Sequence, residues 1–157
     1  MNIVNSVAPQ VDQTTVDLGL QLAVIASMSL VMVVIHTLGL IGISRLLGLR
    51  EKRLLEHAFD HRAVGLIGSF GLLLIMLHLA EIFVFALLYL EVSTLDFEEA
   101  LYYSASAYAT LGRTADYFPS DWRLVGAFEA LIGFILIGWS TAFMVTTMRK
   151  LAENAEK

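Results

Sequence analysis

The stretch "YYSASAYATLGRTADYFPSDW", residues 102–122, contains the residue types best suited to handling ions. Thr110, Leu111, Gly112, Arg113 and Thr114 form its centre, and Asp116 follows two residues later. Rings of backbone carbonyls can replace the hydration shell of a cation, whereas rings of arginine side chains favour anions. The centre of this stretch, residues 110–116, is therefore the candidate ion-contacting segment.

Two glutamates lie inside otherwise apolar segments. Glu81 follows His78 by one helical turn, and Glu129 lies in a later segment. Ionisable groups within a membrane are costly and indicate function. We expect both glutamates to be hydrogen-bonded supports of the segment around residues 110–116, with gating or ion binding as the alternative. His78 is expected to pair with Glu81, and His36 to be a packed or helix-bonded histidine. A single His/Glu pair is a weak metal signature, so no metal site is predicted.

Three apolar runs must position these residues. They extend from Leu18 to Ser44, from Val64 to Leu90 and from Leu124 to Met148, and none contains proline. A membrane-spanning helix needs about 20 residues. The chain has 157 residues, of which 57% are hydrophobic, and its mean hydropathy is +0.73. These values predict three transmembrane helices.

The distribution of basic residues predicts the orientation. Residues 45–62 contain five of them and the tail after Met148 three, whereas the segment before Leu18 has none. Because basic loops stay in the cytoplasm, the amino end is expected outside and the carboxyl end inside. Residues 45–62 are also amphipathic. We expect them either to contact anionic lipid or to form a plain helical linker. We expect His57 and His61 in this segment to lie on a solvated helix face, with metal binding or pH sensing as the alternative. The net charge of −5 gives no nucleic-acid signal.

A short helix is expected between the second and third runs, from Phe97 to Ala109. Thr94 or Asp96 would cap its start. Residues 110–112 would then end it, because Gly112 permits positive φ. A half-helix of this kind, followed by an extended return, exposes backbone carbonyls within the membrane. Such carbonyls are tolerated only where protein buries them or where they line a watery cavity.

The region from His78 to Met148 resembles the two-helix pore module of the bacterial potassium channel family. The resemblance rests on three segments: "HLAEIFVFALLYL" for the outer helix, "FEEALYYSASAYATLG" for the pore helix and filter entrance, and "DWRLVGAFEALIGFILIGWSTAFMV" for the inner helix. It implies a homotetramer in the bacterial plasma membrane, with the third spanning helix lining the pore.

The chain departs from that family at the filter, which there reads T-x-G-Y-G-D. Arg113 replaces the tyrosine, Thr114 replaces the second glycine, and one extra residue precedes Asp116. Fewer stacked carbonyl rings weaken discrimination between potassium and sodium. The resemblance therefore implies the fold without implying potassium selectivity.

Two orientations of Arg113 remain open. Four guanidinium groups on the axis repel one another by about 2 kcal/mol for each pair about 8 Å apart, and would repel cations. Pointing backwards, Arg113 would pair with Glu129, Glu81 or Asp116. We favour the backward orientation. Asp116 and Asp121 form either a solvated acidic loop or a vestibule that concentrates cations.

Gly133 and Gly138 lie in the middle of the third run, in "LIGFILIGW". The family resemblance implies a gating hinge at these positions. Close helix packing is the alternative, because small residues let helices approach one another.

We therefore predict an all-α membrane protein with three spanning helices, a re-entrant pore helix and a tetrameric assembly. The expected divisions are residues 1–63, a pore module over 64–148 and a tail over 149–157. In the pore module, the outer helix is 64–90, the pore helix 97–109, the filter 110–116 and the inner helix 123–148. The first helix is expected to lie peripherally, against its own outer helix or a neighbour's.

The expected function is a pore-loop channel for monovalent cations, potassium or sodium, with weak or atypical selectivity. The alternatives are a non-conducting membrane scaffold or sensor, and an anion-permeable pore that uses an Arg113 ring. No enzyme motif is present, so neither catalytic residues nor a cofactor are predicted.

Overall fold

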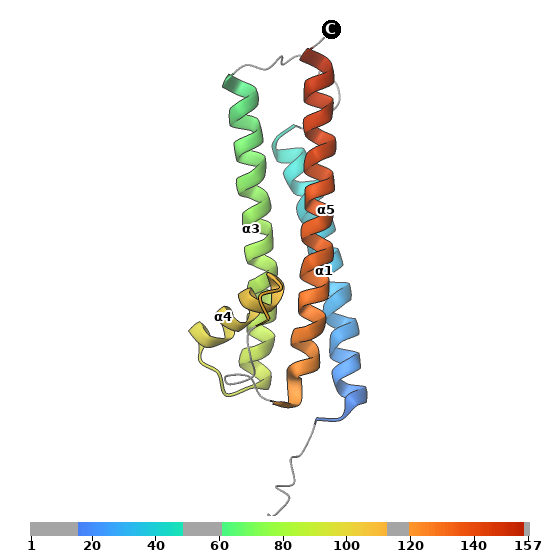
Figure 1. Cartoon of the computed structure of the whole chain (residues 1–157), viewed down its shortest axis with the longest axis vertical. Helices are drawn as coiled ribbons and strands as arrows, with labels where there is room; N and C mark the ends of the chain where they lie inside the picture. Colours follow the sequence, from blue (N-terminus) through green and yellow to red (C-terminus); the bar gives the residue numbers. More distant parts are fainter. Residues whose placement is uncertain (1–15, 49–60, 113–119, 156–157) are drawn as a thin grey trace, which may run out of the picture.

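The computed structural model describes residues 16–48, 61–112 and 120–155, and every regular element among them is helical. Three long helices form a bundle, with a short helix beside it (Figure 1). The elements are α1 Leu18–Leu46, α3 His61–Val92, α4 Phe97–Tyr108, the 3-10 turn η1 Ser120–Trp122, and α5 Arg123–Ala155.

Each long helix can cross a membrane. The apolar stretches are Leu18–Leu46, Gly65–Val92 and Arg123–Arg149, with 29, 28 and 27 residues and mean hydropathies of 2.4, 2.4 and 1.8. All exceed the roughly 20 residues that a bilayer core requires. Only 11%, 22% and 22% of the most apolar window of each stretch is buried within a single chain, as expected for helices that face lipid or neighbouring copies. The predicted all-α membrane fold with three spanning helices is confirmed.

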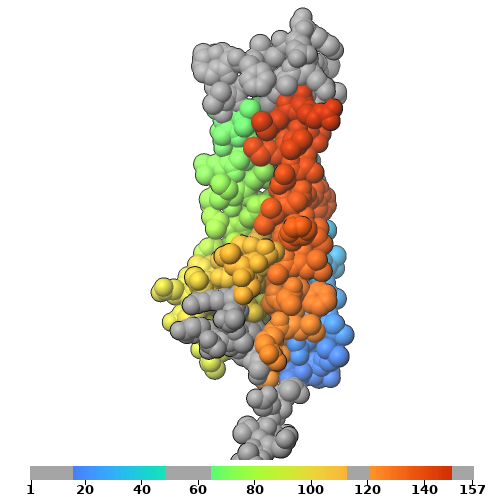
Figure 2. All heavy atoms as spheres, in the orientation of Figure 1, coloured from blue at the N-terminus to red at the C-terminus, as the bar shows by residue number. Residues whose placement is uncertain are grey.

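The short helix α4 lies against the bundle rather than within it. It contacts α3 and α5 and begins near the end of the bundle where α5 starts (Figure 1). Its other end rises towards the middle of α5, and the space-filling view shows it on the front face (Figure 2). The helix α1 packs against both α3 and α5, so it contacts the inner helix of its own chain as well as the outer helix.

The start of α4 is fixed by a reciprocal cap. The amide of Glu99 donates to the Asp96 carboxylate at 2.9 Å, and the amide of Asp96 donates to the Glu99 carboxylate at 3.3 Å. This capping box satisfies two amides that the first turn leaves without partners. Of the two predicted caps, Thr94 and Asp96, the structure uses Asp96.

The end of α4 differs from the prediction. The amide of Thr110 donates to the Ala107 carbonyl at 2.8 Å, and that of Leu111 to the Ser106 carbonyl at 2.9 Å. These two bonds form a Schellman motif, in which the left-handed residue is usually glycine. Here that residue is Thr110, with φ of 58°. The attribution of the break to Gly112 is therefore incomplete, because α4 ends at Tyr108 and the left-handed turn begins at Thr110, two residues before Gly112.

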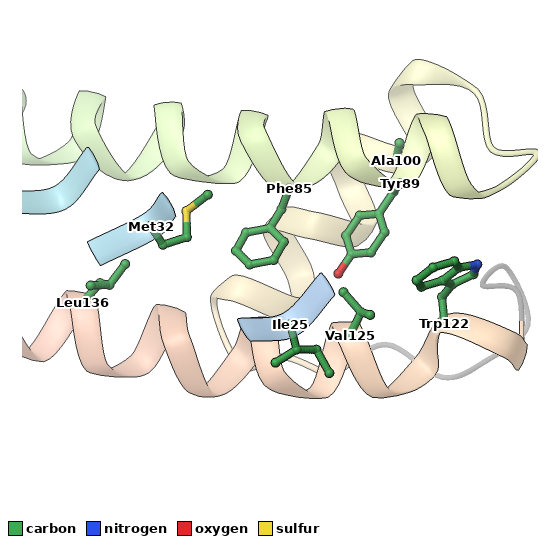
Figure 3. Close-up of a cluster of buried hydrophobic side chains, with 8 residues drawn as sticks. All are labelled: Ile25, Met32, Phe85, Tyr89, Ala100, Trp122, Val125 and Leu136. Atoms are coloured by element: carbon green, nitrogen blue, oxygen red, sulfur yellow. The ribbon is translucent and has the colours of Figure 1, made fainter. Parts of the chain in front are cut away.

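The largest apolar core joins all four helices near α4 (Figure 3). Phe85 and Tyr89 of α3 face Val125 of α5, with Ile25 of α1 close by. The remaining buried members are Met32, Ala100, Trp122 and Leu136. Because α4 contributes Ala100 to this core, its position depends on the packing of the spanning helices.

Candidate functional site

The carboxylate of Glu129 is completely buried on α5, where α4 crosses it. The hydroxyl of Tyr89 donates a hydrogen bond to its Oε2 atom. The Ser104 Oγ atom lies 2.6 Å from its Oε1 atom and 2.9 Å from the Ile82 carbonyl oxygen. The side chain of one pore-helix serine thus joins α3 to α5.

The number of hydroxyl protons limits how these contacts are made. Ser104 has one hydroxyl proton but two neighbouring acceptors, the Ile82 carbonyl and Glu129. Every contact is satisfied if Glu129 carries a proton and donates it to Ser104, while Ser104 donates to Ile82. A neutral carboxylic acid also avoids placing an unpaired charge in this buried position. These contacts therefore predict a protonated Glu129, which the substitution Glu129→Gln tests.

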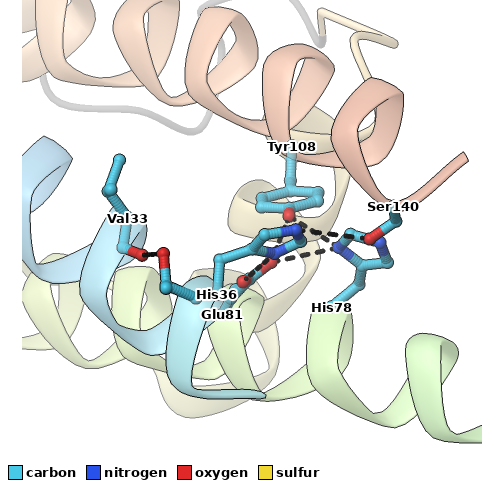
Figure 4. A network of polar contacts seen from close by, with 7 residues as sticks. Val33, His36, His78, Glu81, Tyr108 and Ser140 are labelled. Carbon is cyan, nitrogen blue, oxygen red and sulfur yellow. Dashed lines mark hydrogen bonds and ion pairs between the residues drawn. The ribbon is translucent and has the colours of Figure 1, made fainter. Parts of the chain in front are cut away.

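The second buried carboxylate, Glu81 of α3, contacts two histidines and a tyrosine (Figure 4). The His36 Nδ1 atom lies 2.8 Å from Glu81 Oε1, and the His78 Nδ1 atom 3.0 Å from Oε2. The Tyr108 hydroxyl donates to Oε2 and lies 2.8 Å from His78 Nδ1. The contact of His78 with Glu81 agrees with the expected pairing, and His36 contributes from α1.

The two buried carboxylates contact the same face of α4 at two positions. Ser104 and Tyr108 are four residues apart, so their side chains lie on the same side of the helix. Ser104 contacts Glu129 of α5, and Tyr108 contacts Glu81 of α3. The helix α4 is therefore connected by polar contacts to both α3 and α5.

Two glycines of α5 allow α4 to approach closely. A Cβ atom at Gly126 would lie 2.1 Å from the Tyr103 hydroxyl oxygen, and one at Gly133 would lie 2.5 Å from the Tyr108 carbonyl oxygen. At Gly138 a Cβ atom would meet nothing within 4 Å in the single chain. Gly133 is thus a close-packing position, and the hinge role of Gly133 and Gly138 stays a prediction.

Three of the predicted filter residues follow α4 in the described part of the chain. Thr110, Leu111 and Gly112 are exposed in the single chain, and Leu111 is 77% exposed. The φ angles of Thr110 and Gly112 are both 58°, whereas Leu111 between them is not in the left-handed region. Arg113, Thr114 and Asp116 lie outside the described residues, as does any pairing of Arg113 with Glu129 or Glu81.

Several members of the two polar clusters were not predicted from the sequence. Tyr89, Ser104 and Tyr108 were not singled out, and His36 was not connected with Glu81. The i, i+4 spacing of Ser104 and Tyr108 was the available signal, because it puts two hydroxyls on one face of a short helix. His36 offered only its position in an apolar run, which does not reveal a partner 45 residues away.

The ion channel family model matches residues 71–150, just over half of the chain. The matched region includes most of α3, all of α4 and nearly all of α5, and so contains both buried carboxylates. Comparisons with curated proteins and with solved structures gave no significant match. The match thus covers two spanning helices and the short helix α4 that contacts both of them. The chain belongs to the ion channel family.

Proposed function

We propose that four copies of this chain form a channel that conducts monovalent cations with weak selectivity between potassium and sodium. The amino end would lie outside and the carboxyl end in the cytoplasm of a bacterial cell. The observation that carries the proposal is the exposure of Ala109 to Gly112 at the end of α4.

The depth of this segment follows from its contact with α5. Gly133, which touches Tyr108, is ten residues beyond Arg123, where α5 begins. At 1.5 Å per residue this places the contact about 15 Å along the helix. The hydrocarbon core is about 30 Å thick, so the pore helix ends close to its middle.

Exposed backbone at this depth requires a partner or water. Lipid offers no hydrogen bonds, so irregular backbone within a membrane must be covered by protein or must line a cavity. One chain leaves residues 109–112 uncovered. Symmetry-related copies around an axis would cover their outer side and leave their carbonyls facing a watery path.

The direction of α4 favours a cation on that path. The end of α4 that approaches the axis is its carboxyl end, which carries about half a negative charge. This partial charge favours positive ions.

Buried polar contacts would keep the filter entrance in place. Ser104 and Tyr108 hold the last turn of α4 against Glu129 and Glu81, and Thr110 follows only two residues later. We propose that these two glutamates, together with His78, support the filter. Selectivity would be weak because the sequence from Thr110 to Asp116 lacks the tyrosine and second glycine of the potassium filter.

Ion flux into liposomes tests the proposed function. Purified protein should carry potassium and sodium at comparable rates, with protein-free liposomes as the control. A matched variant with Arg113→Tyr, Thr114→Gly and deletion of Ala115 restores T-L-G-Y-G-D and should favour potassium. Chloride flux without cation flux would instead indicate an anion pore, and no flux of any ion from intact tetramers would indicate a non-conducting scaffold.

A further inference from the structure

A cluster of metal-ligand side chains lies in the middle of the bundle, where α1, α3 and the end of α4 meet (Figure 4). His36, His78 and Glu81 each offer one ligand atom, and these atoms all lie within 4.8 Å of one another. His36 and Glu81 are completely buried, and the His78 side chain is 18% exposed. The three residues come from two different spanning helices.

Two imidazole nitrogens and a carboxylate oxygen form a ligand set that zinc uses with a fourth position left open. Bond lengths of about 2.0–2.2 Å in a tetrahedral site place neighbouring ligand atoms about 3.3 Å apart. The His36 Nδ1 atom lies 2.8 Å from Glu81 Oε1 and the His78 Nδ1 atom 3.0 Å from Oε2, and the three ligand atoms lie within 4.8 Å of one another. Side-chain rotations would bring both nitrogens and the carboxylate to one ion.

The surroundings complete such a site. The Tyr108 hydroxyl, 2.8 Å from His78 Nδ1, is placed to be a fourth ligand or to hold a bound water. The Ser140 Oγ atom lies 3.4 Å from His36 Nε2. When Nδ1 of His36 binds a metal, Nε2 carries the proton and can donate a hydrogen bond to Ser140 Oγ, which is how second partners usually orient ligating histidines.

We propose that His36, His78 and Glu81 bind one divalent transition-metal ion of the zinc class per chain. Histidine and carboxylate ligands suit such ions, and the chain has no cysteine that could bind them instead. An ion would enter past His78, because His78 is the partly exposed member of the cluster. Placing two histidines and a glutamate together inside spanning helices is costly, and a bound cation would offset that cost.

Metal binding would connect the first helix to the filter. The ligands belong to α1 and α3, and Tyr108 brings the last turn of α4 to the same point. A bound ion would therefore cross-link α1 to α3 and fix the residue that precedes the filter entrance. This consequence rests on the proposed channel function, whereas the binding itself does not.

Cobalt titration of the full-length protein in detergent, after treatment with a chelator, tests the site. Cobalt in a tetrahedral nitrogen and oxygen site absorbs visible light, and zinc should displace it at one equivalent per chain. His36→Gln and Glu81→Gln should abolish the signal, while Ser140→Ala should weaken binding by about tenfold. The double variant His57→Gln/His61→Gln, which keeps His36 and His78, is the matched control and should bind normally.

X-ray absorption of the zinc-loaded control variant tests the proposal without disturbing the site. The chain has four histidines, so the control retains only His36 and His78. Its spectrum should show two imidazoles per zinc and otherwise oxygen. Absence of stoichiometric binding to the wild-type protein, loss of binding in the control, or a spectrum without imidazole would overturn the proposal. Because none of these readouts involves flux, a failure of the channel function would be recognised separately.

Discussion

Replacing Gly133 by alanine should displace the pore helix. The added Cβ atom would lie 2.5 Å from the Tyr108 carbonyl oxygen, 2.9 Å from its Cγ atom and 3.1 Å from its Cα atom. Ordinary contacts begin near 3.4 Å, so α4 or α5 must retreat by roughly 0.9 Å. Two of the three close atoms belong to the backbone, and a rotamer change cannot relieve them.

The magnitude follows from the cost of overpacking. Inserting a methyl group into a close-packed contact costs about 1–3 kcal/mol. The same displacement would move Thr110, which is two residues beyond Tyr108, and so would disturb the filter entrance. We therefore expect Gly133→Ala to lower both the thermal stability of the oligomer and the rate of potassium flux into liposomes.

Gly138→Ala is the matched control, because it lies in the same helix and meets nothing within 4 Å. It should retain flux and gain up to about 1 kcal/mol from the better helix propensity of alanine. A Gly133→Ala protein with wild-type stability and flux would refute the packing argument. Altered flux without a loss of stability in either variant would favour the hinge interpretation instead.

Three further substitutions test individual contacts by thermal unfolding in detergent. Glu129→Gln should change stability by less than about 1 kcal/mol, because an amide can donate to Ser104 and accept from Tyr89 as a protonated carboxyl does; a large loss would show that Glu129 is ionised. Asp96→Ala should cost about 1 kcal/mol by removing the capping box, and an unchanged melting temperature would contradict that cap. Thr110→Gly should stabilise the fold by up to about 1 kcal/mol, because threonine is strained at a φ of 58°; destabilisation would show that the threonine side chain contributes more than its backbone strain costs.

The spanning helices could be predicted from the sequence because the signal is compositional. Apolar runs longer than 20 residues have few alternatives to crossing a membrane as helices. The start of α4 could likewise be predicted, because Thr94 and Asp96 were both candidate caps and Asp96 is the one used. These features depend on neighbours in the chain, and no tertiary information is needed to recognise them.

The polar clusters could be predicted only in part, because they depend on how the helices rotate and pack. His78 and Glu81 are one turn apart, so their contact was foreseeable. The contact between His36 and Glu81 depends on where α1 packs against α3. The sequence of an apolar run does not specify that position. Similarly, the left-handed Thr110 could not be foreseen, because threonine rarely adopts that conformation and the nearby Gly112 was the more obvious helix terminator.

Imaging the assembled protein in lipid by electron cryomicroscopy, with potassium present, would test the central claim most directly. The account predicts four copies around one axis, with the backbone of Thr110, Leu111 and Gly112 facing that axis and ion density between the copies. A monomeric particle, or an oligomer in which these residues face lipid or lie outside the membrane, would contradict it.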